Sequence, residues 1–153
     1  MNAPRAAIAS SGPATLDRLP LLLEAVDEVC VAAGADSTQR HDLRLAVEEA
    51  CVNIIRHAYR DGAPGELGLD VAGEPWQGRP AVRVTLQDRG LPFDPLALVA
   101  PQQGADAEDL PLGGLGVHLM RQVTDVQSYH HDAATGNHLT LVKFLTRQHG
   151  EET

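Results

Sequence analysis

The sequence predicts an α+β fold in which a mostly antiparallel sheet carries its helices on one face. Two observations predict it. Apolar residues recur at helical spacing through most of residues 15–60. From Glu66 onward the period changes to two, and strand-like segments follow one another in pairs joined by turn residues. Helices and strands in separate runs favour the α+β class, arranged here as a two-layer sandwich.

The length and composition are typical of one globular domain. The chain has 153 residues, of which 43% are hydrophobic, enough for a single two-layer core. We therefore treat residues 1–153 as one domain with a core over about 6–145 and short flexible tails. Its 12 Lys and Arg stand against 21 Asp and Glu, a formal net charge of −9, and Lys143 is the one lysine. Direct nucleic-acid binding is not expected, because no Lys-rich patch exists to neutralise phosphates.

The sequence carries no signal for export or membrane insertion. The N-terminus lacks a basic stretch followed by an apolar segment, and no apolar run is long enough to span a bilayer. Cys30 and Cys51 form no CxxC pair and no disulfide framework. The prediction is a cytoplasmic protein with structural thiols and no membrane partner.

Helical periodicity and capping residues define the first half of the chain. Gly34 is placed to end one helix, and Asp36 or Ser37 to cap the next. Asp61 and Gly62 close that second helix, because neither favours a helix interior. The expected elements are a short edge strand over 6–10, a helix over about 15–33 and a helix over about 37–60.

The second half reads as two hairpins separated by an irregular segment. Residues 91–112 contain four prolines and several acidic residues, and a loop of this length is usually a functional lid or disordered. A glycine run then opens a helix that extends to about Val123. The expected strands are 67–71, 82–86, 125–131 and 137–145, with turns at 73–80 and 133–136.

Glu49 and Asn53 form the most informative pair on the second helix. They are four residues apart and project together at one edge of an apolar arc. A carboxylate and an amide that are partly dehydrated there call for a polar partner. The alternative is an ordinary surface pair at the margin of an amphipathic helix.

Asp88 shares the inward parity of the strand over 82–86, at the point where Arg89 and Gly90 end that strand. A carboxylate at the mouth of a core needs a hydrogen-bond donor, and one such donor is the exocyclic amino group of a purine. The alternative is that Asp88 only begins a turn, which an Asp-x-Gly sequence often does.

The third candidate is the run Gly113-Gly114-Leu115-Gly116 before the short helix. Glycines at a helix start let backbone N–H groups approach an anion, which predicts a phosphate cradle. The run lacks the spacing of a dinucleotide fingerprint and the Gly-Lys-Ser/Thr of a P-loop. A flexible hinge is the alternative.

Taken in order, these motifs resemble the ATPase superfamily shared by gyrase, the heat-shock chaperone ATPase, sensor histidine kinases and mismatch-repair ATPases. Within it, the stretches LAVEEACVNIIRHAY, QDRGLPFDP and LPLGGLGVHLMRQVTDVQSY are similar to the anti-sigma-factor serine kinases of bacterial partner-switching systems. The resemblance covers about residues 6–145 and implies a Bergerat-type α/β sandwich with an ATP lid.

The resemblance also implies a role for each candidate residue. Glu49 would be the general base for the attacking hydroxyl, and Asn53 would hold a Mg²⁺ ion that bridges the phosphates of ATP. Asp88 would accept from the adenine amino group, with Gly90 and Thr140 shaping the same pocket. The backbone donors to the phosphates would come from Gly113, Gly114 and Gly116, under a lid over 94–112.

The function implied is that of an ATP-dependent protein serine/threonine kinase. It would sequester a sigma factor or similar target, phosphorylate a Ser or Thr on an anti-sigma-factor antagonist, and form a homodimer. The sequence departs from the family pattern because no Arg or Lys lies between Arg89 and Arg121. Arg56 and Arg121 are candidate substitutes. The alternative function is a nucleotide-dependent protein-binding regulatory module without phosphoryl transfer.

Overall fold

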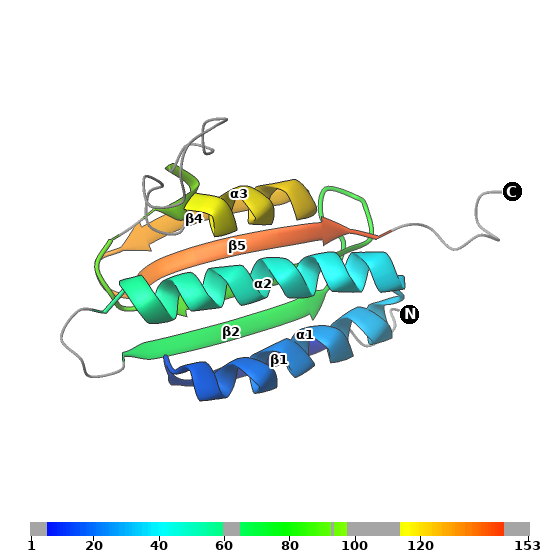
Figure 1. Ribbon diagram of the computed structural model, residues 1–153. Coiled ribbons are helices and arrows are strands. Elements are labelled where there is room, and N and C mark those ends of the chain that lie inside the picture. The colour runs from blue at the N-terminus through cyan, green and yellow to red at the C-terminus, as the bar shows by residue number, and fades with distance from the viewer. Residues whose placement is uncertain (1–5, 60–64, 93, 98–113, 146–153) are drawn as a thin grey trace, which may run out of the picture.

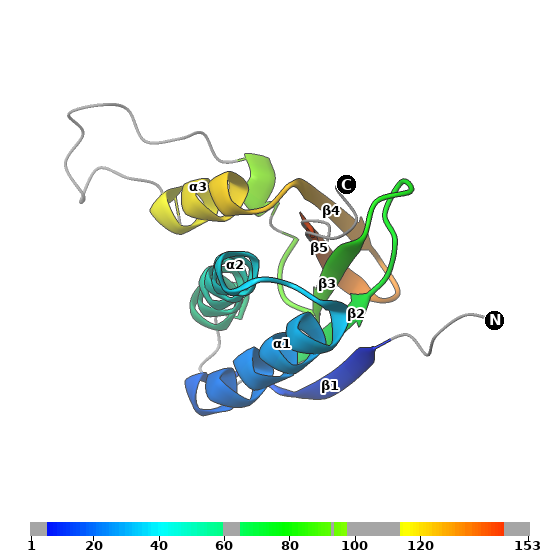
Figure 2. The same cartoon turned by 90° about the vertical axis from the view of Figure 1, so that its right-hand side faces the viewer.

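The described part of the chain forms a five-stranded antiparallel sheet with helices packed on one face. A computed structural model describes residues 6–59, 65–92, 94–97 and 114–145. The strand order across the sheet is β1-β2-β3-β5-β4, and every neighbouring pair is antiparallel. The α-helices of these described residues all lie on the same side of the sheet (Figures 1 and 2). The predicted α+β class and two-layer arrangement are confirmed.

The elements follow the order expected from the periodicity. They are β1 (Ala7–Pro13), the 3-10 helix η1 (Leu16–Arg18), α1 (Leu19–Ala33), α2 (Ser37–His57), β2 (Glu66–Gly73), β3 (Ala81–Asp88), the 3-10 helix η2 (Pro95–Ala97), α3 (Gly114–Val123), β4 (Val126–Asp132) and β5 (Gly136–Phe144).

The core lies between the sheet and the helices, and alternation along the strands builds its sheet side. Leu67, Leu69 and Val71 of β2 point to the helices, and each is at most 2% exposed. The central strand β3 contributes Val82, Val84 and Leu86 in the same way. The same parity puts Asp88 on the helix-facing side, at the end of β3.

The start of α2 is fixed by a capping box. The Asp36 carboxylate accepts from the backbone N–H of Gln39 (2.7 Å), and the Gln39 side chain accepts from the Asp36 N–H (2.9 Å). Two N–H groups without helical partners are thereby satisfied. The helix ends at His57, three residues before the expected boundary, and residues 60–64 lie outside the described part of the chain.

The N-terminal boundaries differ from the expectation. The edge strand was expected over 6–10, but β1 continues to Pro13 because it stays in register with β2 as far as the pair Pro13 and Glu66. The helix expected from residue 15 starts with η1, and α1 begins at Leu19 with Pro20 in its first turn. Proline is suited to this position, where its missing N–H costs no helical hydrogen bond.

Both cysteines are packed inside the helical layer. Cys30 in α1 is 1% exposed and Cys51 in α2 is fully buried. Burial raises the pKa of each thiol to about 12. Because the nucleophilic form is the thiolate, both side chains serve as core residues, as predicted. Among the described helices, none has the length and apolar character needed to cross a bilayer.

The capping box gives a test of the α2 boundary. We expect Asp36→Ala to lower the free energy of unfolding by about 1 kcal/mol, because the Gln39 N–H loses its acceptor. Urea denaturation measures this change. The control is Ser37→Ala, which alters the adjacent exposed residue outside the box. Equal stability of the two variants would show that the box does not hold the helix start.

Candidate functional site

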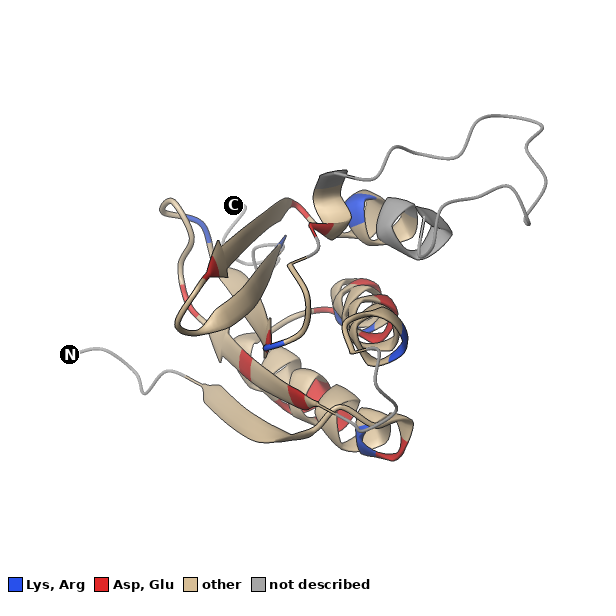
Figure 3. Ribbon diagram, turned by 90° about the vertical axis from the view of Figure 1, so that its left-hand side faces the viewer, with Lys and Arg blue, Asp and Glu red and all other residues tan. Residues whose placement is uncertain are grey.

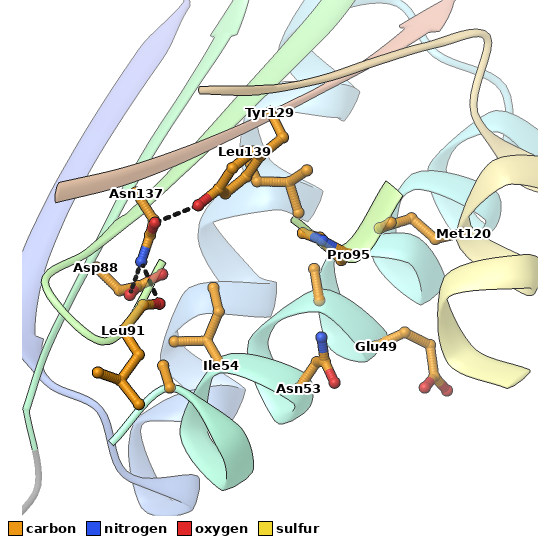
Figure 4. Close-up of a pocket in the computed structure, with 12 residues that line it drawn as sticks. Glu49, Asn53, Ile54, Asp88, Leu91, Pro95, Met120, Tyr129, Asn137 and Leu139 are labelled. Carbon is orange, nitrogen blue, oxygen red and sulfur yellow. Dashed lines mark hydrogen bonds between the residues drawn. The ribbon is translucent and has the colours of Figure 1, made fainter. Parts of the chain in front are cut away.

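A pocket opens between α2, α3 and the ends of β3 and β5. It encloses about 500 Å³ of space, with the solvent at its mouth included. Figure 4 shows the residues that line it. Its polar lining consists of Glu49, Asn53, Asp88, Tyr129 and Asn137, and its apolar lining includes Ile54, Leu91, Pro95, Met120 and Leu139. An apolar cavity with a few convergent polar groups is typical of a small-molecule site.

Asp88 presents one carboxylate oxygen to this pocket. The side chain is buried, and its Oδ1 accepts from the Gly90 N–H and from Asn137 Nδ2, both at 2.9 Å. Within the described part of the chain, Oδ2 has no hydrogen-bond donor. An unpaired carboxylate oxygen at the wall of a pocket is an acceptor available to a ligand N–H group.

Asn137 of β5 holds Asp88 in place, and the sequence did not single it out. Its Nδ2 also faces the carbonyl oxygens of Gly90 (3.3 Å) and Leu91 (3.0 Å). Its Oδ1 accepts from the Tyr129 hydroxyl and lies 3.0 Å from His131 Nδ1. Because both ends of the amide are occupied, Asn137 has one orientation, and it fixes the carboxylate beside it.

Thr140 is the site residue whose expected position is corrected. It pairs across the sheet with Thr85, and the two hydroxyl oxygens are 3.3 Å apart. Successive residues of a strand point to opposite faces, so Thr140 lies on the face away from the helices, whereas Asn137 and Leu139 face the pocket. Asn137 is also the direct partner of Asp88 in the β3-β5 ladder.

Two glycines allow the chain to pass close to Asp88. A Cβ atom on Gly90 would lie 2.3 Å from the carbonyl oxygen of Ala58, which accepts from the Leu91 N–H at 3.0 Å. Gly136 has φ +93°, and a Cβ atom there would lie 2.2 Å from the Asp88 carbonyl oxygen. Glycine is therefore required at position 90 on steric grounds, where the end of α2 contacts the end of β3.

The Tyr59 hydroxyl links the segment after α2 to the start of β2 and to the end of β3. It accepts from the Arg89 N–H (2.7 Å) and the Glu66 N–H (3.2 Å), and donates to the Glu66 carbonyl (2.6 Å). Burial raises the pKa of this hydroxyl above its ordinary value. The start of β2 and the end of β3 are therefore tied to Tyr59, the second residue after α2.

Asn53 of α2 lines the pocket and has an unpaired side-chain oxygen. Its Oδ1 is buried and has no hydrogen-bond partner in the described structure. An orphaned buried acceptor is costly unless a ligand supplies a donor or a cation. An amide oxygen is a ligand type that Mg²⁺ accepts, usually together with phosphate and water oxygens. The residue therefore fits the metal role that the resemblance implies.

Glu49 lies one helical turn before Asn53 and lines the same pocket. Figure 4 shows its carboxylate at the end of the pocket nearest α3. The side chain is half-buried, and within the described residues it forms no ion pair or hydrogen bond. A carboxylate that is free to accept a proton is what a general base requires.

The start of α3 supplies backbone donors. The helix begins at Gly114, so Gly114 and Gly116 lie in its first turn, while Gly113 lies outside the described residues. The first N–H groups of a helix have no helical acceptor and favour an anion. Met120 of the same helix lines the pocket, which connects α3 to the site.

Little of the expected lid is described. Pro95 of η2 lines the pocket, and Arg121 of α3 donates to the Leu96 carbonyl. This contact ties η2 to α3, and it engages one of the two candidate substitute arginines. Arg56 is exposed on α2. Residues 98–112 of the predicted lid lie outside the described part of the chain.

Comparisons with known proteins show what this chain is similar to. The family model described as "Histidine kinase-like ATPase domain" matches residues 12–143. The chain is 33% identical over 102 residues to the serine/threonine-protein kinase BtrW of Bordetella bronchiseptica, covering 67% of this chain and 68% of that protein. It is 36% identical over 110 residues to the serine-protein kinase RsbW of Halalkalibacterium halodurans, covering 69% and 63%. This chain thus spans less than two thirds of that RsbW.

A solved structure shares the fold. The crystal structure of the RsbU and RsbW domains of a Mycobacterium tuberculosis protein matches with a TM-score of 0.61 and 21% identity. The match covers 95% of this chain and 34% of that one. At this identity the likeness concerns the arrangement of helices and strands.

The steric role of Gly90 can be measured. We expect Gly90→Ala to lower the free energy of unfolding by about 1–3 kcal/mol, because the new methyl group meets the Ala58 backbone. The matched control is Gly68→Ala, whose Cβ would have no neighbour nearer than 3.9 Å. That variant is expected to be neutral or slightly more stable, since glycine weakens a strand interior. Equal destabilisation of both variants would contradict the close contact at Gly90.

Proposed function

Because the chain belongs to the histidine kinase-like ATPase family, we propose that it is an ATP-dependent protein serine/threonine kinase of the anti-sigma-factor type. The observation that carries this proposal is the unpaired Asp88 Oδ2 in the same pocket as the orphaned Asn53 oxygen. One group suits the amino group of adenine, and the other suits the metal that accompanies the phosphates.

The base of ATP would be selected by Asp88. The Gly90 N–H and Asn137 occupy Oδ1, which leaves Oδ2 to accept from the exocyclic amino group of adenine. Guanine carries an oxygen acceptor at the corresponding position, and two acceptors facing each other are unfavourable. The apolar side chains of Ile54 and Leu139 are available to pack against the ring.

The phosphates would lie along α2 toward α3. Asn53 would hold Mg²⁺ through Oδ1, and the ion when bound would neutralise phosphate charge. The backbone N–H groups of Gly113, Gly114 and Gly116 would donate to phosphate oxygens. Glu49 would accept the proton of the attacking Ser or Thr hydroxyl and orient that oxygen toward the terminal phosphate.

The proposed partners follow from the same family membership. The relative BtrW is named a serine/threonine-protein kinase and the relative RsbW a serine-protein kinase. We propose that this chain sequesters a sigma factor or similar regulatory target, and that it phosphorylates an anti-sigma-factor antagonist. We further propose that it acts as a homodimer in the cytoplasm. The net charge of −9 favours basic surfaces on its partners.

A second candidate function has its own motivation. The segment between Arg89 and Arg121 contains no Arg or Lys to approach the terminal phosphate. Transition-state charge in phosphoryl transfer is usually neutralised by such a group or by metal. A nucleotide-dependent protein-binding module would retain ATP binding without producing a phosphoprotein.

Nucleotide binding is tested by thermal unfolding. At about 100 times its dissociation constant, Mg²⁺-ATP should add about 2.7 kcal/mol of stability and raise Tm by about 5–10 °C. GTP should produce little shift. Asp88→Asn should weaken ATP binding at least about tenfold, because an amide N–H₂ would face the adenine amino group. Asn53→Ala should abolish the difference between Mg²⁺ and EDTA.

Thr140→Ala is the control for these variants, because Thr140 lies on the other face of the sheet. It should leave ATP affinity unchanged, whereas Asn137→Ala should weaken it by freeing the Asp88 carboxylate. An absent shift in the parent protein would contradict both candidate functions. Equal shifts in all the variants would contradict this site.

Catalysis is tested with Glu49→Gln. The amide retains the shape of the side chain but cannot accept the hydroxyl proton, so we expect phosphate transfer to fall about 100-fold or more. Radiolabelled ATP and the purified antagonist measure the transfer rate, and the same Tm assay checks that ATP still binds. Transfer at the parental rate would refute the general-base role of Glu49. ATP binding without any phosphoprotein would favour the binding-module alternative.

A further inference from the structure

The hairpin of β4 and β5 holds the end of β3 from one edge of the sheet, where β4 is the last strand in the order. The Gln87 side chain donates to the Thr135 carbonyl (2.7 Å), and the Arg89 guanidinium donates to the Ala134 carbonyl (3.0 Å). Both acceptors belong to the turn between β4 and β5. The two residues that flank Asp88 are therefore attached to this hairpin.

The hairpin also presents the Asn137 amide to Asp88, and one orientation of that amide satisfies its surroundings. Its Nδ2 faces three oxygen acceptors, which belong to Asp88, Gly90 and Leu91. The reversed amide would set Oδ1 against those three oxygens, which is unfavourable. Oδ1 is therefore directed toward β4. It needs donors there, because Asn137 is only 4% exposed.

Two residues of β4, Tyr129 and His131, supply these donors. The Tyr129 hydroxyl donates to Oδ1 of Asn137, and His131 Nδ1 lies 3.0 Å from the same oxygen. Because an amide oxygen only accepts, a neutral His131 ring has to carry its hydrogen on Nδ1. Figure 4 shows the bonds of Asn137 to Tyr129 and to Asp88 at opposite ends of the amide.

Alternation along β4 places both donors on the face of the sheet that carries Asn137. His130 lies between them and points to the opposite face, where its ring centroid is 5.6 Å from that of His138. Figure 3 shows few charged positions on the hairpin, and the two strands contain one acidic and one basic residue, Asp132 and Lys143. Within β4, the donors to the Asn137 oxygen are thus a hydroxyl and an imidazole.

This chain of contacts connects the protein surface to the pocket. His131 is exposed, whereas Asn137 and Asp88 are 4% and 6% exposed. Tyr129 lines the pocket, but His131 is not among the described residues that do so. A change of ligand affinity in a His131 variant would therefore arise through Asn137 and not from a lost contact with the ligand.

We propose that Tyr129 and His131 are positioning residues for nucleotide binding, which act on the base through Asn137 and Asp88. While a donor is present, the amide holds the Asp88 carboxylate in the orientation that accepts the adenine amino group. Without either donor, a buried oxygen is left unsatisfied, so the amide turns toward water and releases the carboxylate. This inference rests on the proposed function for the identity of the ligand.

A double-mutant cycle on the full chain tests the proposal, with ATP affinity measured by isothermal titration calorimetry. Tyr129→Phe and His131→Ala each leave one donor on the Asn137 oxygen, so each should weaken Mg²⁺-ATP binding about two- to threefold. The double variant leaves no donor. It should weaken binding about 20-fold or more, which exceeds the product of the two single effects.

A conservative variant and a control separate this role from general damage to the hairpin. The side-chain nitrogen of His131→Asn occupies the place of Nδ1, so His131→Asn with Tyr129→Phe should bind ATP within about twofold of Tyr129→Phe alone. The control is His130→Ala, which removes the neighbouring imidazole from the opposite face. It should leave ATP affinity unchanged, both alone and combined with Tyr129→Phe.

The position of the His131 ring hydrogen provides a second test that needs no nucleotide. Long-range proton–nitrogen NMR spectra, recorded at mildly alkaline pH, show which ring nitrogen carries the hydrogen. We expect Nδ1 in the parent protein. In Asn137→Ala the acceptor is lost, and the hydrogen should move to Nε2. A hydrogen on Nε2 of His131 in the parent protein would overturn the proposal.

Two further outcomes would overturn it: single effects that simply multiply in the double variant, or equal losses of affinity in His130→Ala and His131→Ala. If the parent protein does not bind ATP, the proposed function fails, and the role of Tyr129 and His131 in ATP binding fails with it. If the parent protein binds ATP and the double variant binds it equally well, only the positioning role fails.

Discussion

The buried carboxylate of Asp88 is the constraint on which the rest of the site depends. It lies at the end of β3, where β5 and the end of α2 approach the same point. A buried carboxylate is stable only where hydrogen-bond donors replace the water that it loses. The surrounding residues answer that requirement: Asn137 supplies a donor, and Gly90 and Gly136 allow the backbones to come close.

The same junction explains why the pocket forms between these elements. The carbonyl of Ala58 accepts from Leu91, and the Tyr59 hydroxyl binds both Arg89 and Glu66. These contacts fix the position of the C-terminal end of α2 relative to the end of β3 and the start of β2. Glu49 and Asn53 lie one to two turns nearer the N-terminus of α2. Because the end of the helix is held near Asp88, the helix geometry sets their distance from Asp88. Recognition of the base and chemistry on the phosphates would therefore both depend on this contact between the end of α2 and the sheet.

Much of this arrangement could be predicted from the sequence, because it depends on patterns among residues that are close together in the chain. A change of period from helical to alternating is visible in the residues themselves, and so is the four-residue spacing of Glu49 and Asn53. Alternation along β3 was sufficient to place Asp88 on the inner face. Thr140 was misplaced because its face depends on the parity and register of β5 relative to β3. That register is set by the turn ending at Gly136, whose φ of +93° brings Asn137 opposite Asp88.

Glu49 and Asn53 belong to a single rigid helix, and this has a consequence for how the protein can respond to nucleotide. Two groups on successive turns keep their separation whether the site is empty or filled. The two side chains that we propose hold the metal and accept the proton therefore move together as one unit. Any adjustment to the size of the bound nucleotide then has to come from the opposite side of the pocket, where α3 begins.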